Sequence, residues 1–92
     1  MFMHDDKFVT TFKALADKTR LDIVRNIALK PKDTASCHEV STCSSLSQPA
    51  MSHHFKKLVD AGLLLERKSG TEKFYELNHE LFASVGINPD KL

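Results

Sequence analysis

The stretch LSQPAMSHHFKKLVDAGLL, residues 46–64, carries the strongest local signals in this chain. Ser47 is a favourable N-cap, Pro49 falls in a first helical turn where a missing N–H is tolerated, and Gly62 is placed to end a helix in a left-handed conformation. The pattern therefore predicts a helix over residues 47–61. Its apolar side chains recur at steps of four, three and one and define a buried stripe, which consists of Met51, Phe55, Leu58 and Val59.

The opposite side of this predicted helix is polar, and its ionisable groups are crowded together. It carries Ser52, His53, Lys56, Lys57 and Asp60, with His54 at the border. A metal site, an active site and a nucleic-acid contact surface all require such residues, and an ordinary solvated helix face is the simplest alternative. The rest of the chain has to decide among these four interpretations.

Length and composition indicate one small folded domain. Ninety-two residues suffice for a single modest core, and 41% hydrophobic with 27% charged residues is typical of a globular protein. The longest uncharged apolar run is AGLLL, so no membrane span is expected, and no secretory leader opens the chain. Two cysteines are compatible with a reducing compartment, and we expect a cytoplasmic protein.

The charge is distributed unevenly along the chain. Net charge is +1, but residues 47–75 contain five basic and three acidic side chains, whereas residues 76–92 contain one basic and three acidic ones. A surplus of two positive charges makes residues 47–75 only a weak basic patch. It would bind nucleic acid poorly in one copy, because the affinity increases with the number of phosphate contacts. Two copies of the chain would double it.

The segments before residue 46 follow helical patterns. Phe8, Phe12 and Leu15 share one face of a helix predicted over residues 5–16, and Asp17 is a plausible N-cap for a second helix that stops at Pro31. A loop with a short extended piece leads to a short helix over residues 36–43 and a tight turn at 44–46. The side chains expected to be structural are Phe8, Phe12, Leu15, Leu21, Val24, Ile27, Met51, Phe55, Leu58 and Tyr75.

The segments after residue 62 predict a β-hairpin and a closing helix. Residues 63–68 and 73–77 resemble two strands joined by the four-residue loop SGTE, which contains Gly70. A short helix follows over residues 79–86, and the last six residues are expected to fray. The fold class is therefore mainly α with a small β-hairpin wing. We expect residues 1–92 to form a single winged helix-turn-helix domain, with the helix-turn-helix at about 36–61 and the wing at about 64–78.

Two segments carry a resemblance to a known family. ALADKTRLDIVRNIAL (residues 14–29) and LSQPAMSHHFKKLVDAGLLLERKSGTEKFYEL (residues 46–77) resemble the ArsR/SmtB family of small bacterial winged-helix repressors. The resemblance covers about residues 12–78. It implies a homodimer held by the N-terminal and C-terminal helices, a double-stranded DNA operator that is pseudo-palindromic, and, for many members, release of the operator when a metal or metalloid binds.

The residues of the 47–61 helix support a DNA-reading role independently. A helix that buries one stripe can present the other to the major groove. We assign Gln48, Ser52 and His53 to base edges, because glutamine can bond adenine and serine can bond bases. The residues expected to contact the phosphate backbone are Ser47, Lys56, Lys57, Arg67, Lys68 and Lys73. The wing departs from the family, which commonly has an arginine directly after its glycine, whereas Thr71 and Glu72 follow Gly70 here.

The sequence offers few residues for a sensor site. Metal-responsive family members often carry a Cys-x-Cys pair at positions that correspond here to Ser36 and His38, with Cys37 between them. A redox response through Cys37 stays open, whereas Cys43 is expected to be a small buried hydrophobe. The spacings of the cysteines and of His53 and His54 match no zinc site, and no catalytic signature is present. We therefore predict no metal site, no cofactor and no enzyme.

These observations favour a DNA-binding transcriptional regulator, a homodimeric repressor that a redox or metal signal releases from its operator. The alternative is a winged-helix protein-interaction module without specific DNA binding, which would suit the weak net charge and the Thr71-Glu72 wing. Salt-sensitive binding to duplex DNA distinguishes the two.

Overall fold

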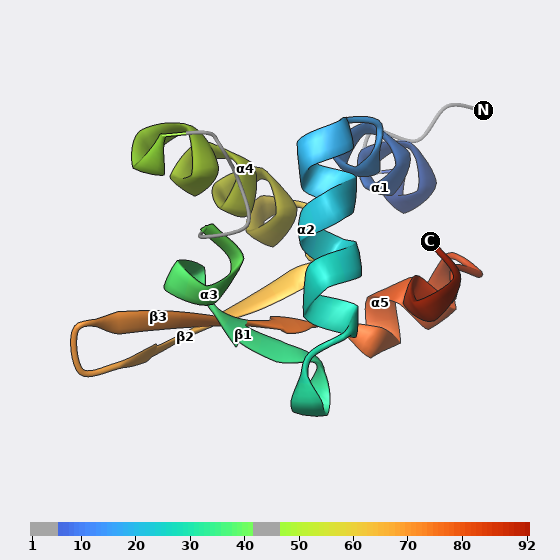
Figure 1. The fold of residues 1–92 in the computed structure, drawn as a ribbon. Coiled ribbons are helices and arrows are strands. Elements are labelled where there is room, and N and C mark those ends of the chain that lie inside the picture. The colour runs from blue at the N-terminus through green and yellow to red at the C-terminus, as the bar shows by residue number, and fades with distance from the viewer. Residues whose placement is uncertain (1–5, 42–46) are drawn as a thin grey trace.

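The computed structural model describes residues 6–41 and 47–92. The elements follow in the order α1 (Lys7–Leu15), α2 (Lys18–Ala28), the 3-10 turn η1 (Pro31–Asp33), β1 (Thr34–Ser36), α3 (Cys37–Ser41), α4 (Gln48–Asp60), β2 (Leu64–Ser69), β3 (Glu72–Leu77), α5 (His79–Ser84) and the 3-10 turn η2 (Pro89–Lys91). Helix α2 lies at the centre and contacts α1, α4 and β3, while the β2–β3 hairpin extends away from the helices (Figure 1). The predicted class, mainly helical with a small wing, is confirmed.

Side-chain caps begin the first two helices. The Asp6 carboxylate accepts hydrogen bonds from the N–H groups of Phe8 and Val9, at 2.9 and 3.4 Å. The Asp17 carboxylate accepts one from the Arg20 N–H at 3.0 Å, so the predicted cap of α2 is confirmed. Both carboxylates also face the positive end of their helix dipole. The position of the α1–α2 turn is therefore set locally.

The sheet has three antiparallel strands in the order β1-β3-β2. The short extended piece expected before Ser36 is a strand, and it pairs with β3, with Ala35 opposite Tyr75. The hairpin differs from the prediction in its loop. Ser69 pairs with Glu72, so the turn has two residues rather than four, and Gly70 supplies a φ of +64°. This pairing lengthens both strands of the wing.

The core is formed by side chains from every layer. The buried hydrophobic residues are Ala14, Ile23, Val24, Ile27, Ala35, Val40, Met51, Phe55, Leu58, Leu63, Leu64, Tyr75, Leu77, Phe82 and Val85. Within it, the rings of Phe55 and Tyr75 stack with centroids 4.3 Å apart, which joins α4 directly to β3. Most of the side chains predicted to be structural are in this set.

Two of those predictions are wrong for the single chain. Phe8 and Phe12 are 46% and 53% exposed, and the face of α1 that packs inward carries Thr11 and Ala14 instead. Phe8 and Phe12 do share one face, but that face points away from the core. Leu15 and Leu21 are half-buried.

The C-terminus does not fray as predicted. Asn88 caps η2 by accepting a hydrogen bond from the Asp90 N–H at 3.0 Å, and Pro89 is buried. Leu92 and Ile87 pack against the core. The C-terminal residues are therefore held in place by apolar contacts with the core, although η2 is only a short 3-10 turn.

Both helices of the predicted helix-turn-helix are present, and the turn between them lies outside the described residues. Helix α3 covers Cys37–Ser41, and the predicted turn at 44–46, together with Cys43, lies outside the described residues. Helix α4 covers Gln48–Asp60, in agreement with the prediction. Leu63, directly after it, donates its backbone N–H to the Leu58 carbonyl, and Gly62 adopts the left-handed conformation with a φ of +82°.

Candidate nucleic-acid interface

Helix α4 begins and ends as its local sequence predicts. The Ser47 hydroxyl accepts a hydrogen bond from the Ala50 N–H at 3.3 Å. At the other end the Asn78 side-chain amide donates to the Gly62 carbonyl at 2.8 Å, which fixes the chain as it leaves the helix. Met51, Phe55 and Leu58 are almost completely buried. The helix is therefore held from one side only, and its other side faces solvent.

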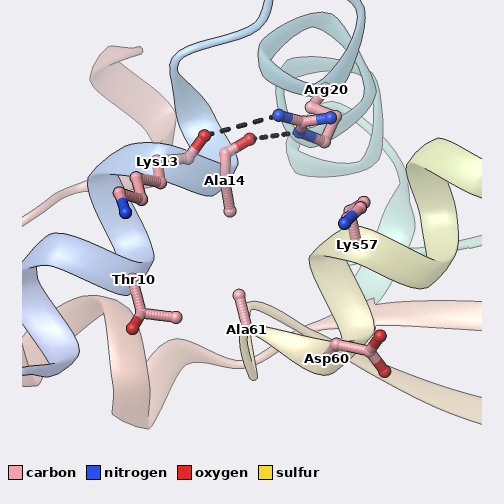
Figure 2. Close-up of a pocket in the computed structure, with 7 residues that line it drawn as sticks. All are labelled: Thr10, Lys13, Ala14, Arg20, Lys57, Asp60 and Ala61. Carbon is pink, nitrogen blue, oxygen red and sulfur yellow. Dashed lines mark hydrogen bonds between the residues drawn. The ribbon is translucent and has the colours of Figure 1, made fainter. Parts of the chain in front are cut away.

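That solvent side carries every residue of α4 that the sequence assigned to DNA. The exposed residues are Ser47, Gln48, Ser52, His53, Lys56 and Lys57. The structure divides the lysines between two flanks, which sequence reasoning had grouped together. Lys56, with Ser52, lies toward the β2–β3 hairpin, whereas Lys57 lies toward α1, beside Thr10 and Lys13 (Figure 2). Only the first flank adjoins the wing.

Intramolecular ion pairs on this surface are exposed and exchangeable. Lys56 pairs with Asp60 one helical turn later, at 3.1 Å, and both side chains are mostly exposed. Lys73 pairs with Glu66 at 3.2 Å across the hairpin. Pairs of this kind contribute little to stability in water. Each ammonium group can therefore exchange its carboxylate for a phosphate at small cost.

The strand register separates the three basic residues of the wing. Lys68 is directly opposite Lys73, so both side chains lie on the face of the hairpin that adjoins α4. Arg67 is opposite Phe74 on the other face, where it pairs with Glu76 at 2.9 Å. Like charges directly opposite each other destabilise an antiparallel pair. The Lys68–Lys73 juxtaposition is thus unfavourable in the isolated chain and suits an anionic partner.

Arg20 is a positioning residue that sequence reasoning missed. Its Nε donates to the Ala14 carbonyl at 2.6 Å, and Nη2 donates to the Lys13 carbonyl at 3.4 Å (Figure 2). Its Nη1 lies 3.4 Å from Nδ1 of His54 on α4. One guanidinium therefore joins the end of α1, the start of α2 and the middle of α4. The only signal in the sequence was an arginine three residues after the cap, which does not distinguish this role from an exposed charge.

The Arg20 cluster also contains a carboxylate. The Asp17 Oδ1 lies 3.8 Å from His54 Nδ1. The hydrogen bond from the Arg20 backbone N–H is the largest effect and holds the pKa of Asp17 below its usual value of 3.8. Burial, the second-largest effect, raises this pKa, and the charges of Arg20 and His54 lower it. Asp17 is therefore ionised at neutral pH and helps hold His54 in place.

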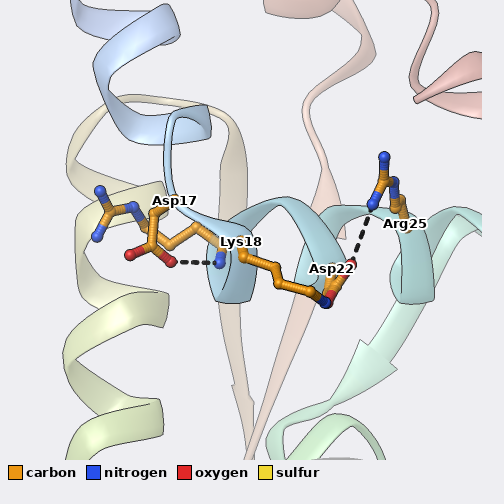
Figure 3. Close-up of polar contacts among 5 residues, drawn as sticks. Asp17, Lys18, Asp22 and Arg25 are labelled. Carbon is orange, nitrogen blue, oxygen red and sulfur yellow. Dashed lines mark hydrogen bonds and ion pairs between the residues drawn. The ribbon is translucent and has the colours of Figure 1, made fainter.

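The exposed side of α2 adds little to the positive surface. Lys18 and Arg25 both bond the Asp22 carboxylate, at 2.8 and 3.1 Å (Figure 3). The hydrogen bond from Lys18, followed by that from Arg25, holds the pKa of Asp22 below its usual value. Two cations share one anion here, away from the wing, and neither was assigned to DNA.

The position of the expected thiolate pair is occupied by a capping box. The Ser36 hydroxyl accepts the Glu39 N–H at 3.0 Å, and the Glu39 carboxylate accepts the Ser36 N–H at 3.1 Å. Ser36 is buried and His38 is exposed. Within residues 6–41 and 47–92, no three His, Cys, Asp or Glu side chains gather as a metal site would require. In the same part of the chain, no helix is long and apolar enough to cross a membrane.

Comparisons with known proteins agree with this geometry. Residues 15–67 match a family described as a helix-turn-helix domain. The chain is 40% identical over 86 residues to the arsenical resistance operon repressor of Staphylococcus xylosus, covering 88% of this chain and 75% of the relative. It is 36% identical over 74 residues to the repressor of the same description from Bacillus subtilis, covering 80% and 69%.

Solved structures share the fold. HlyU from Vibrio cholerae superimposes with a TM-score of 0.75 at 33% identity, covering 92% of this chain and 90% of that one. An ArsR family transcriptional regulator superimposes with a TM-score of 0.78 at 24% identity, covering 92% and 84%, a likeness that concerns the fold alone. Because the family match covers residues 15–67, which include α2 and all of α4, and a named repressor is 40% identical over 88% of the chain, this chain belongs to the ArsR/SmtB family of winged helix-turn-helix, DNA-binding transcriptional repressors.

Proposed function

We propose that this protein acts in the cytoplasm as a homodimeric repressor that binds a pseudo-palindromic operator through α4 and the wing. The observation that carries the proposal is the division of α4 into a buried stripe and an exposed polar face, on which Lys56 and Asp60 form a solvent-exposed ion pair. A helix so presented has the diameter of the major groove. The role requires no catalytic step.

The proposed contacts follow the positions of the side chains. Gln48, Ser52 and His53 read base edges from the N-terminal half of α4, where recognition helices make such contacts. The phosphate backbone is bound by Ser47, Lys56, Lys57, Arg67, Lys68 and Lys73. Because Arg67 lies on the far face of the hairpin, we expect it to contribute less than Lys68 and Lys73.

The homodimer is supported by the outward face of α1. Phe8 and Phe12, with the similarly exposed Val9 between them, form an apolar strip with no cover from the chain itself within residues 6–41 and 47–92. Exposed apolar strips of this kind mark association surfaces in small proteins. A dimer would also double the number of phosphate contacts, which compensates for the weak charge of one chain. We place the dimer contact on α1 and the C-terminal helices.

We assign the release of the operator either to a redox change at Cys37 or to the binding of a metal. Cys37 is half-exposed at the start of α3, next to the DNA-reading helix. The relatives named for arsenical resistance suggest a thiol-directed signal. Gel shifts repeated with a reductant, an oxidant and Zn(II) separate the two classes of signal.

A salt titration of DNA binding tests the proposal. Gel shifts would use the duplex upstream of the protein's own gene with wild type, Gln48→Ala, Lys56→Ala and the control Lys18→Ala. We expect Gln48→Ala to weaken specific binding by ~1–3 kcal/mol and to leave non-specific binding nearly unchanged. Lys56→Ala should weaken binding to all sequences and reduce the salt slope by about one unit.

Lys18 is a matched control because it is an exposed lysine that pairs with an aspartate four residues later, as Lys56 does. If Lys18→Ala reduced the slope as much as Lys56→Ala, the contacts would not be localised on α4. If the wild type bound no duplex even at low salt, the proposal of a repressor would be wrong, and the alternative of a protein-interaction module would be favoured.

A further inference from the structure

Of the two histidines of α4, His53 is exposed and His54 lies against the start of α2. The His54 side chain is only 18% exposed, and its Nδ1 atom has two neighbours of opposite charge. Nη1 of Arg20 lies at 3.4 Å and Oδ1 of Asp17 at 3.8 Å. The same ring nitrogen can therefore bond either the donor of a cation or the acceptor of an anion.

The proton of the His54 ring selects between these neighbours. A guanidinium has donors only, so Nδ1 can accept a hydrogen bond from Arg20 only when it carries no proton. In the imidazolium form both ring nitrogens are donors, so Nδ1 loses Arg20 as a partner and donates to the Asp17 carboxylate. Histidine is the type of side chain that changes its charge between about pH 5 and 8, so the exchange is to be sought in this range.

Both neighbours are fixed in place by other bonds. Arg20 donates to the Ala14 carbonyl at 2.6 Å and to the Lys13 carbonyl at 3.4 Å (Figure 2). Its guanidinium therefore stays at the end of α1 whether or not it bonds His54. Asp17 stays at the start of α2, because its Oδ1 accepts the Arg20 backbone N–H at 3.0 Å. A change of partner therefore has to be taken up by α4, which carries His54.

Other charged groups near His54 come from α1 and from α4 itself. Those that share one cavity with Arg20 are Lys13 of α1 and Lys57 and Asp60 of α4. Lysine and aspartate are side-chain types that do not titrate between about pH 5 and 8. The His53 ring lies 6.0 Å from the His54 ring in an edge-on arrangement. Because His53 is of the same titrating type, it has to be kept in every variant that tests His54.

We propose that His54 is a positioning residue of the DNA-reading helix, and that its proton moves α4 between two attachments to the body of the protein. In the neutral form α4 is held by Arg20, and through it by α1. In the protonated form it is held by Asp17 at the start of α2. His53, the next residue, is assigned to base edges, so a shift of α4 at His54 moves a reading side chain. Acid should therefore reduce the discrimination of the operator from other DNA, a consequence that rests on the proposed function.

Urea midpoints at two pH values test the exchange without DNA. Wild type, Arg20→Met and Asp17→Asn would be compared at about pH 8 and 5.5, at a fixed protomer concentration. Asparagine is as good an N-cap as aspartate, so Asp17→Asn keeps the cap of α2 and removes only the charge. The pKa of Asp17 lies below 3.8, so this carboxylate is charged at both pH values.

The two variants should respond to acid in opposite directions. Neutral His54 bonds Arg20, so the loss of midpoint in Arg20→Met should be larger at the higher pH and shrink in acid. Protonated His54 bonds Asp17, so the loss in Asp17→Asn should grow in acid by about 0.3 M urea, as expected for a partly buried ion pair. A purely structural role of either residue would give losses that do not depend on pH.

His54→Gln supplies the matched control, because glutamine can still accept from Arg20 but carries no titrating proton. In this background both pH trends should disappear. Any other pattern would overturn the exchange, including losses that change together with pH and opposite trends that persist in His54→Gln.

The tautomer of His54 is a readout that needs no variant. Nitrogen NMR of the wild-type imidazole should show that Nδ1 is the unprotonated nitrogen of the neutral ring, as acceptance from Arg20 requires. A neutral ring with its proton on Nδ1 would exclude this bond and overturn the proposal.

A DNA-binding arm tests the consequence for the operator. Its readout is the ratio of operator affinity to non-specific affinity, because added positive charge in acid strengthens binding to all sequences. From about pH 8 to 5.5 this ratio should fall about fivefold more in the wild type than in His54→Gln, at the lower end of coupling between two sites. His53 is present in both proteins, so its own titration cancels.

The two arms separate this inference from the proposed function. If the opposite stability trends appeared but no duplex were bound, the repressor would fail and the exchange of partners at His54 would stand. If the trends appeared and the affinity ratio changed equally in wild type and His54→Gln, His54 would not position the reading helix.

Discussion

Replacing Arg20 by methionine removes the guanidinium that joins α1, α2 and α4 while keeping an unbranched stem of similar helix propensity. The substitution deletes the 2.6 Å bond to the Ala14 carbonyl and the two longer contacts, each at 3.4 Å, to the Lys13 carbonyl and to His54. The Asp17 carboxylate, 3.8 Å from His54, stays but loses the positive charge of Arg20, which helps to lower its pKa.

The expected loss follows from the geometry of these bonds. A hydrogen bond from a charged donor contributes ~1.5–3 kcal/mol. Arg20 is half-exposed, so water can replace part of what is lost, and the two contacts at 3.4 Å are near the limit of hydrogen bonding. We therefore expect Arg20→Met to lower the free energy of unfolding by about 1–2 kcal/mol. For a domain of this size the thermal midpoint falls by roughly 4–15 °C.

Urea unfolding at a fixed protomer concentration measures the effect, because association would otherwise change the apparent stability. The control is Arg25→Met, the same substitution on the same helix, where the guanidinium forms an exposed ion pair with Asp22 on the same helix. Its midpoint should stay close to that of the wild type, since exposed pairs contribute little. Equal losses in the two variants would refute the reasoning, because the cause would then be α2 itself and not the bonds to α1 and α4.

Two further predictions concern the dimer and the pH dependence of stability. Phe12→Glu places a charge in the exposed strip of α1, so it should leave the helical content intact but raise the dimer dissociation constant at least about tenfold. The control is Leu65→Glu, because Leu65 is an apolar residue of similar exposure on β2. If sedimentation velocity found both variants equally dimeric, α1 would be excluded as the interface. Glu39→Gln tests the capping box: the hydrogen bonds from Ser36 hold the folded-state pKa of Glu39 below its usual 4.5, so its contribution is complete above about pH 4.5 and is lost as the pH falls through the folded value. The difference in urea midpoint between wild type and Glu39→Gln should therefore shrink below pH 4.5, and a difference independent of pH would be inconsistent with this role.

Local signals explain why α4 was predicted well. Its cap, its first-turn proline and its terminal glycine each act within a few residues, so Ser47, Pro49 and Gly62 suffice to set both ends of the helix. The apolar stripe was equally readable, and Met51, Phe55 and Leu58 are buried as predicted. The helix that carries most of the proposed DNA contacts is therefore the one most fully encoded by neighbouring residues.

Features that depend on distant partners were not readable from local patterns. The strand β1 has three residues, and its partner β3 lies about 40 positions later, so nothing near Ala35 indicates the pairing. The Arg20 bond to His54 crosses 34 positions. The periodicity of Phe8 and Phe12 gave their shared face correctly but not what covers it, because an apolar stripe has the same pattern whether it packs on its own core or on another chain.

The capping box of α3 shows how a sensor position can be lost while the DNA-reading half is kept. The resemblance implies a thiolate at Ser36, but here the Ser36 hydroxyl accepts the Glu39 N–H, and the side chain is buried beside β3, where Ser36 pairs with Phe74. A cysteine at this position would be a weaker acceptor for that N–H, and a thiolate would add charge at a buried site. Neither change touches α4, whose buried stripe and capped ends do not involve residue 36. Ser36 therefore stands where the resemblance implies a thiolate ligand, and the capping box that holds α3 in place leaves the DNA-reading helix unchanged.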